Sequence, residues 1–368
     1  MRTRAAVLFG FNQPFKIQEV ELEGPRSGEL LVRMVASGIC HTDVSVAQGV
    51  ISRVPLPAIL GHEGAGIVQE VSEGSRRFQP GDHVVMAAEP HCGHCRACLQ
   101  GKPFHCVMHT PWAFDGAMPD GSRRFRAAGR EISHFFCESS FSEFAVIPEH
   151  IAVLVPSDLP LEKLCTLGCG VQTGAGAVLN TARVQMGESV AVLGCGGVGL
   201  SAVMGARLAR ALPIIAVDVV PSRLELAQEF GASHAVNAAG SDVVEEIRKI
   251  TGRGADYAFE CVGKAETIRQ AVDSVRPNGG TAVITGAAHS DSDVKLDAFS
   301  LIMKNVVGNI QGSSVPEVFL PMLIEFWRQG QFPFDRLSPQ TYALDQINEA
   351  IADMLRGAVI KPVIRMSG

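Results

Sequence analysis

The second half of the chain alternates short apolar runs with helical patterns, and this alternation restricts the fold more than any other feature. The run SVAVLG at 189–194 precedes a helical pattern that begins at glycines, and IIAVD at 214–218 precedes another. The segments HAVN, DYAFECV and GTAVITG continue the series. Strands that alternate with helices form a parallel, doubly wound sheet. The sequence therefore predicts an α/β domain at residues 171–310.

The first part of the chain has a different pattern. Residues 30–38 (LLVRMVASG) and 65–71 (AGIVQEV) read as strands, and glycine-rich turns separate them. After about residue 311 the strand–helix rhythm is lost, so this tail is expected to rejoin the first part. The predicted fold class is α/β, with a β-rich domain at 1–170 and 311–368 and the doubly wound domain between them in sequence.

Charge and hydropathy exclude several classes of function. The 368 residues carry a formal net charge of -6, whereas a nucleic-acid-binding protein would favour a basic face. Residues 189–206 lack charge, but five glycines in this stretch suit a turn better than a membrane-spanning helix. Arg2 and Arg4 precede an apolar run of five residues, too short for a secretory signal. We therefore expect a cytoplasmic protein without a membrane or nucleic-acid partner.

Four cysteines lie close together in the stretch HCGHCRACLQGKPFHC at residues 91–106. They are Cys92, Cys95, Cys98 and Cys106. A reducing compartment argues against a disulfide framework, and the glycines and proline of the stretch break the helix that a CxxC redox pair requires. Scattered free cysteines are the remaining alternative. Two overlapping CxxC steps and a fourth thiol favour structural zinc, which would order a loop with few apolar residues.

A glycine pattern follows the first strand of the doubly wound domain. Gly194, Gly196 and Gly199 form G-x-G-x-x-G between a predicted strand and a predicted helix. The first glycine allows a tight turn, the second lets the backbone approach a pyrophosphate, and the third lets helix and strand pack closely. Gly197, in the same turn, is a further candidate contact. The pattern indicates a dinucleotide site.

Asp218 ends the next predicted strand of this domain. A carboxylate there can bind both ribose hydroxyls of NAD, and it would repel the 2′-phosphate of NADP. Arg223, in the following helix, could flank the adenosine. The alternative is an ordinary glycine-rich turn in which Asp218 only caps a helix. Both features together favour NAD as the cofactor.

Three further segments place a ligand of the zinc type among glycines. They are GICHTD (38–43), GHEGAG (61–66) and LGCGVQTGAG (167–176), which contain Cys40, His62 and Cys169. Taken alone, a buried cysteine is usually a small core residue. A lone histidine more often forms ordinary hydrogen bonds than binds a metal. Their spacing along the chain does not show that they meet in space.

These segments, the cysteine cluster and the GCGGVG turn occur in the order that is typical of zinc-dependent medium-chain alcohol dehydrogenases. The chain resembles this family over nearly its whole length. It is most similar to the aryl-alcohol (benzyl alcohol) dehydrogenases, on the stretches LGCGVQTGAGAVLN and FWRQGQFPFDRL. The resemblance implies a GroES-like β-rich catalytic domain and a Rossmann NAD-binding domain. It also implies an enzyme that oxidises a primary alcohol to its aldehyde with NAD.

The resemblance assigns two zinc ions to each subunit. Cys40, His62 and Cys169 would hold a catalytic zinc, with Glu63 as a residue that exchanges as a ligand. The four clustered cysteines would hold a structural zinc. Asp43 would fix the tautomer of the ligand histidine.

The resemblance also assigns the proton path and the phosphate contacts. Thr42 would accept the proton of the substrate, while His41 and Lys361 would contact the phosphates of NAD. The family has a histidine at the end of the proton relay, where this chain has Ser45. We therefore expect His41, or water held by Ser45, to complete the relay.

The substrate pocket departs from the family pattern at Ala88, where many members carry a bulky aromatic residue. The missing ring leaves room for a flat substrate group, and Ile51, Phe135 and Phe136 are candidate apolar walls. Any core also contains such residues, so the walls could be ordinary packing. With the resemblance, this favours an aromatic or allylic primary alcohol.

Several alternatives remain open from the sequence. One is a thiol-adduct formaldehyde dehydrogenase of the same fold. Members that act on glutathione adducts use an arginine where this chain has Thr110, so the thiol carrier would be one other than glutathione. An aliphatic alcohol dehydrogenase, a non-catalytic zinc-binding module and a family member kept only for its fold are the others. The segment VVGNIQG (306–312) is expected to form a strand, either within the domain or across a subunit interface. Together with the connection 107–136, it favours a homodimer, with a tetramer as the alternative.

Overall fold

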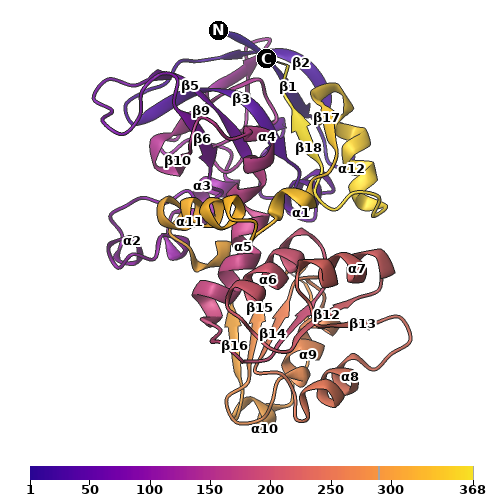
Figure 1. Ribbon diagram of the computed structural model, residues 1–368. Coiled ribbons are helices and arrows are strands. Elements are labelled where there is room, and N and C mark those ends of the chain that lie inside the picture. Colours follow the sequence, from indigo (N-terminus) through magenta and orange to yellow (C-terminus); the bar gives the residue numbers. More distant parts are fainter. Residues whose placement is uncertain (289–290, 368) are drawn as a thin grey trace. The chain divides into compact units, whose positions relative to one another are not determined.

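The computed structural model describes residues 1–288 and 291–367, which form two compact units (Figure 1). The first unit contains Met1–Cys169, Val315–Met322 and Asp335–Gly368, and the second contains Gly170–Ser314 and Leu323–Phe334. The expected limits at residues 170 and 311 differ from these units chiefly in the segment 323–334, which packs with the second unit. As a division into domains, the expected limits stay a prediction.

The first unit contains two β-sheets. A five-stranded antiparallel sheet has the order β4-β1-β2-β7-β8. A second sheet has the order β10-β6-β5-β3-β18-β17, and β9 also pairs with β3. The first sheet consists of β1 (Arg2–Leu8), β2 (Lys16–Leu22), β4 (Ala58–Ile59), β7 (Phe125–Ala127) and β8 (Arg130–Ile132). The second consists of β3 (Glu29–Gly38), β5 (Gly64–Val71), β6 (His83–Met86), β9 (Phe144–Pro148), β10 (Ala152–Leu154), β17 (Thr341–Ala343) and β18 (Val363–Arg365).

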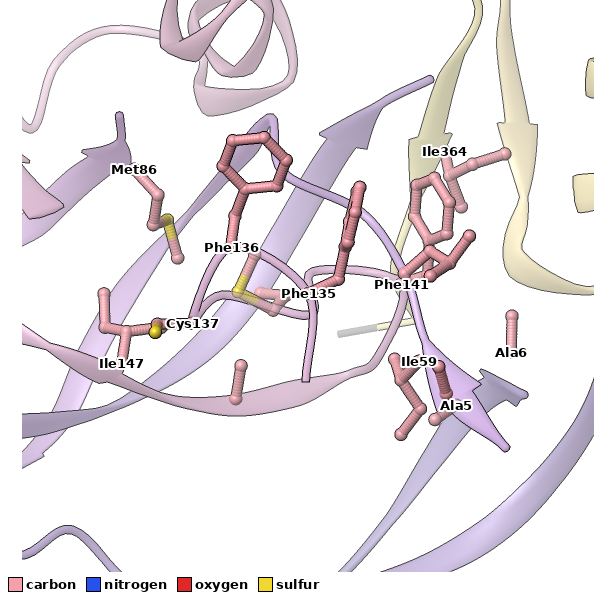
Figure 2. Close-up of a cluster of buried hydrophobic side chains, with 14 of the residues drawn as sticks. Ala5, Ala6, Ile59, Met86, Phe135, Phe136, Cys137, Phe141, Ile147 and Ile364 are labelled. Carbon is pink, nitrogen blue, oxygen red and sulfur yellow. The ribbon is translucent and has the colours of Figure 1, made fainter. Parts of the chain in front are cut away.

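Strand β3 organises the core of the first unit. It pairs with β5, β9 and β18, and eight of its ten residues are buried. Because β18 comes from the end of the chain, this pairing attaches the tail to the second sheet of the first unit. Figure 2 shows part of the adjoining core, with Met86, Phe135 and Phe141 among the labelled side chains.

The helices of the first unit are short. They are α1 (His41–Ala47), α2 (Arg96–Leu99), α3 (His109–Phe114), α4 (Leu161–Leu164) and α12 (Ile347–Leu355). Helix α11 (Pro316–Arg328) begins in the first unit and ends in the second. Among the described residues, no helix combines the length and the apolar character that a membrane span needs.

The second unit contains a six-stranded sheet in which all neighbouring strands are parallel. Its order is β13-β12-β11-β14-β15-β16, so the strand order reverses beside β11. The strands are β11 (Val190–Leu193), β12 (Ile214–Asp218), β13 (His234–Asn237), β14 (Tyr257–Glu260), β15 (Thr281–Ile284) and β16 (Asn305–Gly308). The helices are α5 (Gly170–Gly176), α6 (Gly197–Leu208), α7 (Pro221–Phe230), α8 (Val243–Thr251), α9 (Ala265–Ser274) and α10 (Ala298–Leu301).

The predicted strand–helix alternation is confirmed in this unit, together with the α/β fold class. In doubly wound sheets, ligands bind at the carboxyl ends of the strands where the strand order reverses. Here that position is the end of β11, directly before the predicted glycine turn.

Candidate metal centres and cofactor site

Four residues from three distant parts of the sequence meet in the first unit. Each offers one ligand atom, and the four atoms all lie within 4.8 Å of one another. They are Cys40, His62, Glu63 and Cys169. The fold therefore brings together the three segments whose convergence the spacing alone did not show.

Local structure positions each member of this group. Cys40 is the N-cap residue of α1, while His62 and Glu63 lie in the extended segment directly before β5. Cys169 follows a 3-10 turn at Cys165–Gly168. A Cβ on Gly168 would lie 2.1 Å from the carbonyl oxygen of Met86, so only glycine permits this close approach beside Cys169.

Asp43 connects two of these segments. Its Oδ2 accepts a hydrogen bond from the backbone N–H of Cys40 at 2.9 Å, and its Oδ1 accepts one from Gly61 at 3.0 Å. Oδ1 also lies 3.2 Å from Nδ1 of His62, and both side chains are fully buried. A carboxylate at Nδ1 holds the proton there and leaves Nε2 as the metal-binding nitrogen.

The donor set fits a zinc ion. Two thiols, one imidazole nitrogen and one carboxylate are all zinc ligands, and three protein ligands with one exchangeable position are typical of catalytic zinc. His62 Nε2 is buried and has no hydrogen-bond partner in the described part of the chain. A buried imidazole nitrogen without a partner is costly unless a metal occupies it. The assignment of these side chains as ligands stays a prediction.

Lys361 lies against the same group. Its Nζ donates a hydrogen bond to Oε1 of Glu63, and the residue is 5% exposed. Burial lowers the pKa of Lys361, but the charges of Glu63, Cys40 and Cys169 outweigh it, so the net pKa lies above its ordinary value. The ion pair with Glu63 was not predicted from the sequence. The expected phosphate contact of Lys361 stays a prediction.

Aromatic rings surround the imidazole of His62. Phe136 stacks on it with ring centroids 4.7 Å apart, and Phe135 meets it edge-on at 5.3 Å. Phe114, which the sequence did not single out, contacts both phenylalanines. Phe136 has a φ of 53°, and such a left-handed conformation costs a non-glycine residue on the order of 1–3 kcal/mol. Figure 2 shows Phe135 and Phe136 projecting from one loop.

The other predicted wall residues lie in the same core. Ala88 is fully buried and belongs to the hydrophobic cluster that contains Phe135 and Phe136, and Ile51 is half-buried against it. These positions are compatible with a pocket wall and also with ordinary core packing. Their role in substrate binding stays a prediction.

Helix α1 carries the residues expected to transfer the proton. Thr42 Oγ1 lies 3.6 Å from Sγ of Cys40, and both Thr42 and Ser45 are half-buried. Residues three apart in a helix share a face, so the side chains of Thr42 and Ser45 lie on the same face of α1. His41 is exposed at the first position of the helix.

The cysteine cluster forms the second metal-compatible group. Its four sulfurs lie within 4.8 Å of one another, and two pairs are 3.6 Å apart. Four thiolates around zinc at about 2.3 Å would be separated by about 3.8 Å. The backbone N–H groups of Cys98 and Val107 lower the pKa of Cys95 to about 6, which favours its thiolate. The group fits the predicted structural zinc.

The predicted glycine turn has the form of a dinucleotide cradle. A Cβ on Gly199 would lie 1.7 Å from the carbonyl oxygen of Gly194, so the start of α6 can approach the strand only with glycine there. A Cβ on Gly196 would meet nothing within 4 Å among the described residues, which leaves space for a phosphate. Gly197 begins α6, whose N-terminus favours negative charge.

Asp218 and Arg223 lie at this turn. Asp218 ends β12, and its carboxylate accepts hydrogen bonds from the backbone of Cys195 at 2.7 Å and of Val220 at 2.9 Å. The Nε of Arg223, on α7, has no hydrogen-bond partner among the described residues. The turn, the acidic strand end and the basic side chain fit a dinucleotide.

Comparison with known proteins now decides the family. Residues 26–157 match the family described as "Alcohol dehydrogenase GroES-like domain", and residues 197–327 match the family described as "Zinc-binding dehydrogenase". The chain belongs to the zinc-binding alcohol dehydrogenases. The predicted family, the GroES-like and Rossmann architecture and the enzyme class of an NAD-dependent zinc oxidoreductase are thereby confirmed.

Individual relatives of this alcohol dehydrogenase act on different substrates. A solved "Alcohol dehydrogenase zinc-binding domain protein" from Burkholderia ambifaria is 45% identical, with a TM-score of 0.97 over 100% of both chains. The benzyl alcohol dehydrogenase of Acinetobacter calcoaceticus is 38% identical, with a TM-score of 0.95 over 100% of both chains. An S-(hydroxymethyl)glutathione dehydrogenase of Haemophilus influenzae is 39% identical over 99% of this chain and 97% of its own.

Proposed function

We propose that this enzyme oxidises aromatic primary alcohols to aldehydes, reversibly, with NAD as the cofactor. The observation that carries the proposal is the group of Cys40, His62, Glu63 and Cys169, which lies beside the rings of Phe135 and Phe136. A zinc ion held by this group would supply Lewis-acid chemistry that acidifies an alcohol hydroxyl. NAD supplies the hydride acceptor.

The side chains of the enzyme have separate tasks in this reaction. Thr42 accepts the hydroxyl proton of the substrate and passes its own proton toward Ser45, one helical turn along α1. Asp43 holds the imidazole of His62 in the tautomer that exposes Nε2. Lys361 holds the carboxylate of Glu63 beside the ligand group. The substrate thus loses a proton to the protein and a hydride to NAD.

Two observations support an aromatic substrate. Fully buried Ala88 puts a small side chain in a core that is rich in phenylalanine, and a benzyl alcohol dehydrogenase shares this fold over its whole length. A second candidate is oxidation of S-(hydroxymethyl)glutathione, because dehydrogenases with that activity are 38–39% identical to the chain. Thr110, exposed on α3 in place of the expected arginine, argues against it.

A substrate comparison tests the proposal. Purified enzyme with NAD should oxidise benzyl alcohol with a kcat/KM well above those for ethanol, octanol and S-(hydroxymethyl)glutathione. A preference for the glutathione adduct would replace the proposed substrate class and keep the zinc and NAD chemistry. No turnover of any of the four alcohols by enzyme with two zinc ions would overturn the proposal.

Replacement of Ala88 by phenylalanine should change the substrate preference. The added ring would take the space that we assign to the aromatic group, so we expect kcat/KM for benzyl alcohol, relative to that for ethanol, to fall about 10-fold or more. Using the ratio cancels any loss of folded enzyme from overpacking. A ratio that is unchanged or higher would show that Ala88 does not shape the pocket.

Replacement of Asp218 by asparagine should weaken the choice of NAD over NADP. The amide keeps an acceptor oxygen for one of the two backbone N–H groups, and it loses the charge that binds ribose and repels a 2′-phosphate. Charged hydrogen bonds contribute about 1.5–3 kcal/mol, so the ratio of kcat/KM for NAD to that for NADP should fall roughly 10- to 100-fold. Glu225→Gln, on α7, is the matched control and should leave the ratio unchanged.

We also propose a homodimer that forms through the edge strand β16. All four of its residues are exposed, including Val306 at 43% and Val307 at 37%, and such an edge presents unpaired backbone groups. Sedimentation equilibrium should give twice the chain mass, and a monomer at micromolar concentration would contradict this assignment.

A further inference from the structure

Glu138 is a fully buried carboxyl that none of the sequence motifs includes. Its Oε1 accepts a hydrogen bond from the backbone N–H of Gly64 at 2.6 Å. Gly64 directly follows the proposed ligand pair His62 and Glu63 and begins β5. A Cβ on Gly64 would lie 2.7 Å from this same oxygen, so glycine is what permits the close approach.

The backbone on the other side of the ligand pair has a matching contact. Gly61 donates its backbone N–H to Oδ1 of Asp43 at 3.0 Å. Two buried carboxyl groups therefore hold the two ends of one short extended segment, Asp43 before His62 and Glu138 after Glu63. Asp43 also touches the imidazole, whereas Glu138 acts only through the backbone.

The loop that carries Glu138 meets the same segment at a second place. Ser140 lies two residues after Glu138, and its Oγ lies 2.8 Å from Oγ of Ser37, the residue of β3 that pairs with Gly64. The backbone N–H of Ser140 donates to the carbonyl of Gly61 at 3.1 Å. The loop that carries Glu138 thus contacts both ends of the ligand segment.

We propose that Glu138 is a positioning residue of the catalytic metal site, which fixes the backbone that presents His62 and Glu63. The inference rests on the metal role assigned to these two residues under the proposed function. Without an acceptor at this place the N–H of Gly64 would be buried unsatisfied, and the segment would shift to relieve it. Loss of a group that holds a metal ligand in place, without itself touching the metal, typically lowers metal affinity by about 10- to 100-fold.

The test is the rate at which purified enzyme releases zinc to a colorimetric chelator, a readout that needs no substrate. Release should have two phases, one from each zinc site. Cys169→Ala enzyme should keep only the structural zinc, so its single phase identifies that site. Glu138→Leu should accelerate release from the catalytic site at least about 10-fold and leave the structural phase unchanged. Glu138→Gln keeps an acceptor oxygen and should stay within about threefold of the unmodified enzyme.

Two further variants complete the design. Ser142→Ala loosens the same loop, where its hydroxyl donates to the carbonyls of Ser139 and Phe144, but it does not touch the ligand segment and should release zinc normally. Ser140→Ala should accelerate the catalytic phase by a smaller factor, and it keeps the test decisive if Glu138→Leu does not fold.

Three results would overturn the inference. They are an unchanged catalytic phase in both Glu138→Leu and Ser140→Ala, equal acceleration of both phases, and a Glu138→Gln variant as fast as Glu138→Leu. Failure to oxidise any alcohol would refute the proposed function without altering these rates, so the two failures are distinguishable.

Discussion

Replacement of Cys169 by alanine should leave one zinc ion per chain and abolish most alcohol oxidation. Cys169 contributes one of the two thiols of the group around His62, and the remaining Cys40, His62 and exchangeable Glu63 would hold zinc poorly. Lewis-acid activation contributes several kcal/mol to such reactions, so turnover should fall at least about 1,000-fold. Metal content by mass spectrometry and steady-state NADH formation measure the two effects.

Cys165→Ala is the matched control for this experiment. Cys165 is fully buried and lies four residues before Cys169, but its sulfur contacts the carbonyl of Glu162 and it lies outside both metal-compatible groups. This variant should keep two zinc ions and substantial activity. Loss of zinc from Cys165→Ala, or two zinc ions with full activity in Cys169→Ala, would contradict the assigned ligand set.

Replacement of Cys98 by alanine should unfold the loop of residues 92–106 and leave the catalytic zinc in place. The loop has little core of its own, since α2 contains no buried residue and Leu99 is 74% exposed. Structural zinc contributes about 10–16 kcal/mol to the folding of small metal-binding segments. Trypsin cleavage after Arg96 should therefore accelerate at least about 100-fold, which requires a loss of only about 3 kcal/mol of local stability.

Leu99→Ala is the control for this loop, because its side chain is exposed and it leaves all four thiols present. It should keep two zinc ions and the original cleavage rate. Slow cleavage of Cys98→Ala with one zinc ion would mean that the loop folds without its metal. Two zinc ions in Cys98→Ala would mean that Cys98 is not a ligand.

Much of the second unit could be predicted from the sequence because its signals are local. The strand expected at IIAVD is β12 in the structure, and the following helix begins at Pro221 and ends before Gly231, as its caps indicate. The segment VVGNIQG was expected as one strand, but β16 ends at Gly308 and a 3-10 turn follows. Gln311 and Gly312 in that turn have positive φ, so a strand could not have extended to residue 312.

The long connection after the cysteine cluster was harder to predict. Residues 107–136 contain α3 and the two short strands β7 and β8, each of three residues. Such short strands lack periodicity, and they form because β7 pairs with β2 from a remote part of the chain.

The sequence by itself determined which chemical groups this protein has and which of them lie close together along the chain. The cysteine cluster and the glycine turn each consist of residues a few positions apart in the chain. Their geometry therefore follows from local backbone rules. Only the tertiary structure decided that Cys40, His62 and Cys169 share one site, that Lys361 pairs with Glu63, and that Glu138 supports Gly64. Those contacts join residues far apart in the chain, and they arise from sheet pairing and core packing, which no local pattern records.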